Sequence, residues 1–386
     1  MIDTSSFISF LIKKNVNAFY GVPDSLLKPL CKNFLDLPKN IHQITTNEAN
    51  AIASSIGHHL ATGNVGCAYF QNSGLGNTIN PLVSLASKDV YSIPLLLIIG
   101  WRGEILENDN QLKDEPQHIQ QGRITLNQLK VLNIPYKIIS KNDIKWKEKI
   151  HKLLDIATTE NRPVALVCRK STFKYSLDSE IKLEVNIEIN DKKLFYREEA
   201  IKEIIKILPH KVPIFSTTGM ASRELYEFRK SRNQIPVDFY TVGGMGCASS
   251  IALGFIRSSK NTNQVICIDG DGSVLMHMGS LFKIAKQKGF IQIIINNNSH
   301  DSVGGQPTGA FEIDFKKLGY SIGFDRCYSI FSKKELEKVL KKALSDINYS
   351  SLIELKVKKG NREDLGRPKE SPNQNKKTFM KEWSKK

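Results

Sequence analysis

The strongest candidate for chemistry is an acidic turn that ends an apolar run, in the stretch "VICIDGDGSVLMHMG" of residues 265–279. Asp271 follows the run between Gly270 and Gly272, and a helix-like pattern begins near Ser273. Glycines let a ligand approach the backbone closely, and a helix N-terminus favours an anion. The turn therefore suits a metal or a phosphate group, although an aspartate that only caps a helix would explain it when it is taken alone.

A run of asparagines closes the next apolar run, in "IIINNNSHDSVGGQPT". One helix-like segment separates the two runs, so we expect a strand–helix–strand unit whose strand ends meet at one edge of a parallel sheet. The Asp271 carboxylate and an asparagine carbonyl then converge where Mg²⁺ needs hard oxygen ligands. Because Mg²⁺ usually keeps water and substrate phosphates in its other positions, the pattern predicts a site for a magnesium-bound diphosphate.

The elements that position this turn belong to an α/β chain. The 386 residues are 40% hydrophobic, and they suffice for two domains with real cores. Each half alternates apolar, strand-like runs with amphipathic segments, which predicts two doubly wound parallel sheets. We expect domains at residues 1–172 and 195–386, joined by a polar linker at 173–194. Ligands of such sheets bind beyond the carboxyl ends of the strands.

Charge, cysteines and hydropathy argue against other classes of protein. The net charge is +16, but the lysines are scattered and no groove-reading motif accompanies them, so no nucleic acid is expected. The six cysteines include no CxxC pair, which favours buried thiols in a reducing cytoplasm. No apolar run is long enough to span a membrane, and the N-terminus is typical of a capped helix. A dinucleotide-binding module would need GxGxxG after the first strand, where "GVPDSLL" stands.

The motif "GDGS" followed by "NN" resembles the thiamine-diphosphate motif of the pyruvate-decarboxylase-like enzymes. The resemblance implies a pyrimidine-binding and a diphosphate-binding domain of the thiamine-diphosphate fold, without a middle domain. It implies thiamine diphosphate and Mg²⁺ as cofactors, with Asp271, Asn297 and the carbonyl of Ser299 as metal ligands. Strict counting from Asp271 favours Asn298 in place of Asn297. The implied cofactor contacts in this half also include Gly219, Gly244, Met245, Gly270, Gly272 and Ser273.

Two of these implied roles have a structural alternative. Met245 would support the bent shape of the cofactor, but a methionine there is also typical of a core. In the first half, "TNEANAIA" resembles the segment that carries the family's activating glutamate, which makes Glu48 the implied proton relay and cofactor contact. A first-turn glutamate that interacts with the helix dipole is the alternative, with Asn47 or Thr46 as the cap. Since the superfamily joins two domains from different subunits, the resemblance implies a homodimer or larger assembly with the active site at the interface.

A longer series of blocks resembles the phosphonopyruvate decarboxylases: "GVPDSLLKPL", "TNEANA", "GWRGE", "KDEPQHIQQG", "STTGMASRELYE", "NSHDSVGGQPT" and "REDLGRP". The implied reaction is non-oxidative decarboxylation of 3-phosphonopyruvate to phosphonoacetaldehyde and CO₂, in phosphonate biosynthesis of the 2-aminoethylphosphonate type. Sulfopyruvate decarboxylase, or another thiamine-diphosphate-dependent 2-keto acid decarboxylase, is the alternative. The basic C-terminal extension falls under the resemblance to about residue 376, so we do not expect it to be a flexible tail.

A substrate with a carboxylate and a phosphonate needs cations and N–H donors around it. Arg102 and Lys113 can supply positive charge, and arginine can pair with an anion through two N–H groups. Asp24 and His118 resemble the acid and the histidine that handle protons in related decarboxylases. The remaining candidates for substrate contact are Ser25, His300 and Ser302.

Overall fold

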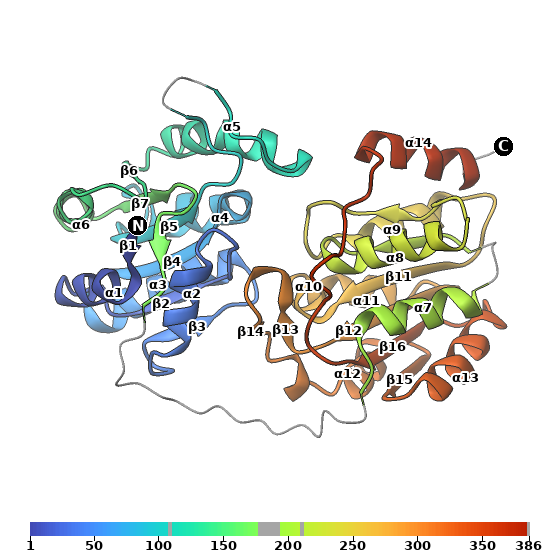
Figure 1. Ribbon diagram of the computed structural model, residues 1–386. Coiled ribbons are helices and arrows are strands. Elements are labelled where there is room, and N and C mark those ends of the chain that lie inside the picture. Colours follow the sequence, from blue (N-terminus) through green and yellow to red (C-terminus); the bar gives the residue numbers. More distant parts are fainter. Residues whose placement is uncertain (107–109, 177–193, 209–211, 384–386) are drawn as a thin grey trace. The chain divides into compact units, whose positions relative to one another are not determined.

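The computed structural model describes residues 1–106, 110–176, 194–208 and 212–383. It divides into two compact units, Met1–Asn186 and Ile187–Lys386. Each unit is built on a six-stranded sheet in which all neighbouring strands are parallel, with helices on both faces (Figure 1). The prediction of two doubly wound parallel sheets without a middle domain is confirmed. Within the described part of the chain, no helix is both long and apolar enough to cross a membrane.

The first unit has the strand order β3-β2-β4-β5-β7-β6. These strands are β2 (Phe19–Gly21), β3 (His42–Ile44), β4 (Gly66–Gln71), β5 (Leu95–Gly100), β6 (Tyr136–Ile139) and β7 (Pro163–Cys168). Its helices are α1 (Thr4–Lys13), α2 (Lys28–Leu35), α3 (Glu48–Thr62), α4 (Leu75–Pro81), α5 (Pro116–Val131) and α6 (Trp146–Glu160). Asp3 caps α1 by accepting a hydrogen bond from the Ser6 amide, as the N-terminal sequence predicts.

The central strand β5 shows why the apolar runs have no polar alternation. Leu96 and Ile98 belong to the core on one face of the sheet, and Leu95, Leu97 and Ile99 belong to the core on the other. A strand covered on both faces must be apolar at every position. The apolar run "LLLIIG" therefore continues to the carboxyl end of the strand at Gly100.

A small two-stranded sheet extends the first unit past its predicted boundary. β1 (Ile2–Asp3) pairs with β8 (Phe173–Lys174), so these last residues still belong to the first unit. They are also the first residues of the linker predicted at 173–194. Most of that predicted linker lies outside the described residues.

The second unit has the strand order β10-β9-β11-β12-β16-β15. These strands are β9 (Ile214–Ser216), β10 (Phe239–Tyr240), β11 (Val265–Gly270), β12 (Phe290–Asn296), β15 (Arg326–Ile330) and β16 (Ser351–Lys356). Its helices are α7 (Arg197–Ile207), α8 (Met220–Ser231), α9 (Ala248–Ser258), α10 (Asp271–Met276), α11 (Leu281–Ile284), α12 (Phe315–Ile322), α13 (Lys333–Leu344) and α14 (Pro372–Trp383). A hairpin of β13 (Ser299–His300) and β14 (Gln306–Pro307) follows the asparagines. Strands β11 and β12 are direct neighbours, so the acidic turn and the asparagine turn lie at the same edge of this sheet.

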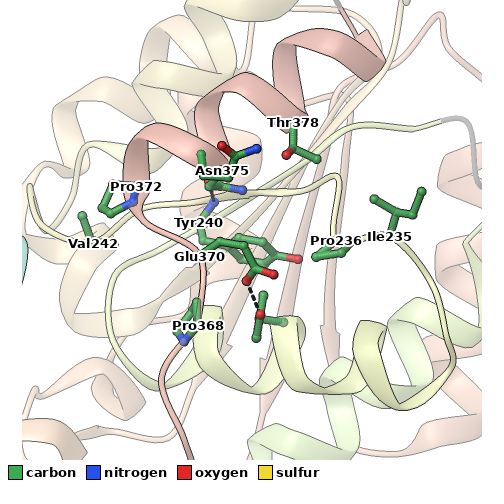
Figure 2. Close-up of a pocket in the computed structure, with 11 residues that line it drawn as sticks. Ile235, Pro236, Tyr240, Val242, Pro368, Glu370, Pro372, Asn375 and Thr378 are labelled. Atoms are coloured by element: carbon green, nitrogen blue, oxygen red, sulfur yellow. Dashed lines mark hydrogen bonds between the residues drawn. The ribbon is translucent and has the colours of Figure 1, made fainter.

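The C-terminal extension is an ordered part of the second unit as far as Trp383. The Phe379 ring of α14 packs edge-on among three other phenylalanine rings, and the Trp383 indole N–H donates to the Val237 carbonyl at 3.0 Å. Upstream, the Glu370 carboxylate accepts a hydrogen bond from the Tyr226 hydroxyl. The extension lines a cavity of about 230 Å³ together with Tyr226 of α8, β10 and the loop before it. Figure 2 shows the residues around this cavity. The order continues beyond residue 376, where the sequence resemblance ends.

All six cysteines are free, as the sequence analysis expected. Five are buried, and Cys247 is half-buried. The five buried cysteines form no disulfide, so their side chains act as small apolar core residues.

Candidate active site

Asp271 is a buried acid without a cationic partner. It is the first residue of α10, directly after β11, and is only 3% exposed. The Thr308 hydroxyl donates to its Oδ2 at 2.5 Å, but among the described residues no lysine, arginine or histidine pairs with it. Burial raises the pKa of Asp271 to about 7. A divalent cation would supply the missing positive charge, so the residue fits a metal ligand.

The three asparagines that follow β12 make different contacts. Asn296 is fully buried, and its Nδ2 donates to Glu354 Oε1 at 2.8 Å. Asn297 is hydrogen-bonded at both ends of its carboxamide, since Nδ2 donates to Asp301 Oδ2 at 2.7 Å and Oδ1 accepts from the Ser299 amide at 3.2 Å. These contacts hold the first two asparagines within the turn.

Asn298 is the asparagine that faces the acidic turn. The Thr308 hydroxyl oxygen lies 2.5 Å from Asp271 Oδ2 and 3.4 Å from Asn298 Oδ1, so it stands between the two side chains. Asn298 has φ near 52°, a left-handed conformation that asparagine tolerates better than most residues. The Thr308 hydroxyl therefore links the side chain of Asn298 to that of Asp271.

The glycines around this turn leave space for a ligand. A Cβ atom added at Gly219 or Gly270 would meet nothing within 4 Å, and Gly219 has φ of 95°. Gly244 is also left-handed, with φ of 61°. By contrast, a Cβ at Gly272 would lie 2.8 Å from the His300 ring, so this glycine permits the hairpin to pack on the turn. Open space at two glycines and close packing at a third fit a shaped diphosphate site.

Two further predicted cofactor contacts lie in loops of the same unit. The Ser273 hydroxyl accepts from the Gly246 amide at 2.8 Å and lies 3.0 Å from the Thr217 hydroxyl. This bond joins the acidic turn to the loop that carries Met245. Met245 is half-buried and is not part of any core cluster found among the described residues. Its position is thus compatible with a contact to a ligand.

In the first unit, Glu48 is buried at the start of α3. Asn47 is the N-cap, and its side chain accepts from the Asn50 amide. Glu48 is 6% exposed, and its Oε2 accepts a hydrogen bond from Asn77 Nδ2 at 2.7 Å. A Cβ at Gly74 would lie 2.4 Å from Glu48 Oε1. Asn77 and Gly74 both come from "NSGLGN" after β4, and neither is among the predicted site residues.

Asp24 is a second buried acid of the first unit. It is fully buried, and its Oδ2 accepts from the Leu27 amide at 3.1 Å. Burial raises the pKa of Asp24 to about 6. A Cβ at Gly100 would lie 1.9 Å from Asp24 Oδ2, so only glycine fits at the end of β5. The protonation state of Asp24 therefore changes close to neutral pH.

Arg102 links two of the predicted substrate loops but is already paired. Its Nε donates to Asp114 Oδ2 at 2.7 Å, and a second N–H donates to the other carboxylate oxygen. A third N–H donates to the Ser25 hydroxyl at 2.9 Å. Asp114 thus compensates the positive charge that the sequence analysis assigned to an anionic substrate.

The remaining predicted substrate residues differ in exposure. Lys113 and Ser302 are exposed, while His118 is half-buried in the first turn of α5. His300 is half-buried in β13, and burial lowers the pKa of its imidazole to about 4, which keeps it neutral. His300 lies against the acidic turn of its own unit, through Gly272.

Comparisons with known proteins agree with this arrangement. Residues 4–128 match the thiamine pyrophosphate enzyme N-terminal TPP binding domain, and residues 216–355 match the C-terminal TPP binding domain. The chain is 31% identical to a phosphonopyruvate decarboxylase of Streptomyces viridochromogenes, over 96% of this chain and 92% of that protein. A phosphonopyruvate decarboxylase of Streptomyces hygroscopicus is also 31% identical, over 97% and 92%. A sulfopyruvate decarboxylase of Methanosarcina acetivorans is 28% identical, over 86% of each chain. The chain therefore belongs to the family of thiamine-diphosphate-dependent decarboxylases.

Proposed function

We propose that the chain decarboxylates 3-phosphonopyruvate to phosphonoacetaldehyde and CO₂, in the biosynthesis of phosphonates. The observation that carries this proposal is the similarity to two phosphonopyruvate decarboxylases over 96% and 97% of the chain, which includes both units. Sulfopyruvate is the second candidate substrate, because a sulfopyruvate decarboxylase matches over 86% of the chain at 28% identity. The two substrates differ in the charge of one group only, a phosphonate or a sulfonate.

The proposal includes Mg²⁺ with Asp271 and Asn298 as its side-chain ligands. Asp271 is a buried acid without a cationic partner among the described residues, and the Thr308 hydroxyl contacts both its carboxylate and the side-chain oxygen of Asn298. Both are hard oxygen ligands of the kind that Mg²⁺ prefers. With Asn298 in place of Asn297, the carbonyl ligand two residues further on becomes that of His300 in place of Ser299.

The chain's own residues would divide the work as follows. When bound, thiamine diphosphate supplies the attacking carbon and accepts the electron pair released with CO₂. Glu48, held by Asn77, would exchange a proton with the cofactor's aminopyrimidine ring. Asp24 has a pKa of about 6 and would exchange protons with the reacting substrate, with His118 as a further candidate for that role. Burial of both acids keeps bulk water away from their protons.

Several side chains, and not Arg102 alone, would bind the carboxylate and the phosphonate or sulfonate of the substrate. Since Asp114 neutralises Arg102, the Arg102–Ser25 pair would orient an anion through hydrogen bonds more than through net charge. Lys113 is exposed and has no ion pair among the described residues, so it is the stronger candidate for net positive charge. His300 and Ser302 complete the proposed set from the second unit.

We also propose that the active form is a homodimer or a larger assembly. Relatives of the chain include proteins named as alpha and beta subunits of sulfopyruvate decarboxylase, so members of this group do assemble from several chains. Analytical ultracentrifugation with and without cofactor would measure the assembly, and a monomer that is fully active would contradict the proposal. A cytoplasmic location stays a prediction.

The test of the function is release of aldehyde from 3-phosphonopyruvate, sulfopyruvate and pyruvate in parallel, with thiamine diphosphate and Mg²⁺ present or omitted. We expect turnover that requires the cofactor, with the highest kcat/KM for phosphonopyruvate. Glu48→Gln is the control for chemistry, because it should bind cofactor but turn over roughly 10²–10⁴ times more slowly. A higher kcat/KM for sulfopyruvate would replace the substrate and leave the cofactor roles intact.

A further inference from the structure

We propose that Asp301 is a positioning residue for the metal turn, acting on it through Asn297. This inference rests on the proposed function, since it assigns a role toward Mg²⁺. One oxygen of Asp301, Oδ2, accepts three hydrogen bonds from three separate parts of the second unit. The donors are Asn297 Nδ2 at 2.7 Å, Arg197 Nη1 at 3.1 Å and the Gly360 amide at 3.1 Å.

The arginine of this cluster is fixed from its other side. Arg197 begins α7, and it donates through Nε and Nη2 to the two carboxylate oxygens of Glu224 in α8, at 2.9 and 3.0 Å. The exposed side-chain fractions are 8% for Arg197, 1% for Glu224 and 8% for Asp301. Two helices therefore hold the guanidinium in place, and the guanidinium holds Asp301.

The charges in the cluster explain why Asp301 needs its other donors. The Arg197 guanidinium is shared between the carboxylates of Glu224 and Asp301. The carboxamide of Asn297 and the amide of Gly360 supply the missing hydrogen bonds to Asp301. A buried acid is costly unless it is paired and hydrogen-bonded, so these donors are strongly constrained to stay where they are.

The constraint reaches the metal turn through one residue. Asn297 immediately precedes Asn298, and its carboxamide is bound at one end to Asp301 and at the other to the Ser299 amide. These two bonds restrict rotation of the Asn297 carboxamide, directly before the left-handed backbone of Asn298. The Gly360 amide ties the segment after β16 to the same oxygen. Partners of this kind, one step behind a metal ligand, often change metal affinity by about 10–100-fold.

In the experiment, isothermal titration calorimetry follows the binding of Mg²⁺ to metal-free protein that is saturated with thiamine diphosphate. Asp301→Ala should raise the Kd for Mg²⁺ by at least about tenfold. Asp301→Asn keeps the size and an acceptor oxygen, so it should recover part of the affinity, and it serves if the alanine variant does not fold.

The matched control is Asp238→Ala in the same unit. Asp238 is buried and accepts from Arg229 Nε and Nη2 at 2.9 and 3.1 Å, but none of its hydrogen bonds reaches the asparagine turn. Both alanine variants should unfold more easily than the parent. Only Asp301→Ala should lose affinity for Mg²⁺.

A double-mutant cycle with Asn297→Ala tests the route. If Asp301 acts through Asn297, the two changes together should raise the Kd little more than either change alone. Full additivity would overturn the route, and a normal Kd in both Asp301 variants, or an equal loss in Asp238→Ala, would overturn the role. The parent protein separates the two claims: if it binds no Mg²⁺ with thiamine diphosphate, the proposed function falls first and this inference falls with it.

Discussion

Asp238 and Asp271 are two buried carboxylates of the same parallel sheet with opposite surroundings. Asp238 lies just before the edge strand β10, where Arg229 donates to both of its oxygens and the Tyr240 hydroxyl adds a third bond. Asp271 lies just after the central strand β11 and receives a hydroxyl hydrogen bond but no cation from the described residues. The first has its countercharge within the fold, whereas the second has none among the described residues.

The positions of the two acids agree with this difference. Ligands of doubly wound sheets bind beyond the carboxyl ends of the strands, which is where Asp271 lies, and Asp238 lies at the opposite end of its strand. A buried charge alone therefore does not identify a site. An uncompensated buried charge at the carboxyl end of a strand is the more informative feature.

The largest effect should come from removal of the uncompensated acid. Asp271→Ala should abolish cofactor-dependent aldehyde release, because the metal loses its charged ligand and the diphosphate loses its anchor. The measurement is turnover together with the thermal shift produced by thiamine diphosphate and Mg²⁺, which should vanish in this variant. Retention of both the shift and the activity would mean that Asp271 is only a helix cap.

Removal of the compensated acid should act on stability instead. Asp238→Ala leaves Arg229 buried without its partner, so we expect the free energy of unfolding to fall by about 3–5 kcal/mol. Urea denaturation of the parent and the variant would measure this loss. The folded variant should bind the cofactor with the same Kd as the parent. A higher Kd would mean that Asp238 also affects cofactor binding, which would contradict the difference proposed between the two acids.

Asp24 extends the comparison to the first unit through pH. Its folded pKa of about 6 lies above the ordinary value of 3.8, so ionisation of Asp24 disfavours the folded state. Its contribution to stability is greatest below pH 4 and is lost as pH rises toward 6. Between pH 5 and 7 the loss is roughly 1.4 kcal/mol, which Asp24→Asn should not show. The free-energy difference between variant and parent, measured by urea denaturation at pH 5 and pH 7, should therefore grow, and an equal difference at both would contradict the assignment.

Periodicity and motif spacing were enough to predict both sheets and the meeting of the acidic and asparagine turns. The pattern was less informative at β15, whose sequence "RCYSI" has only two buried residues, and at the three-residue strand β3. Short edge strands bury too little surface to leave a clear alternation. The order of α14 depends on Phe379, whose ring finds its partners more than a hundred residues earlier in the sequence.

The partners of the site residues could not be predicted from local sequence. Thr308, Asn77 and Arg197 meet Asp271, Glu48 and Asp301 only after the chain has folded. Asn298 shows the same limit on a smaller scale. Resemblance of the turn favours Asn297 and residue counting favours Asn298, and local sequence could not show that Asn298 shares the Thr308 hydroxyl with Asp271.

The most direct test of the account is the Kd for Mg²⁺, at saturating thiamine diphosphate, of Asn298→Ala and Asn297→Ala compared with the parent protein. The account predicts the greater loss for Asn298→Ala, because a ligand oxygen is removed, and a loss of only about tenfold for Asn297→Ala, because a positioning contact is removed. Loss of binding in Asn297→Ala with a normal Kd in Asn298→Ala would contradict it. That result would make Asn297 the metal ligand and would leave the contacts of Asn298 with Thr308 as structural.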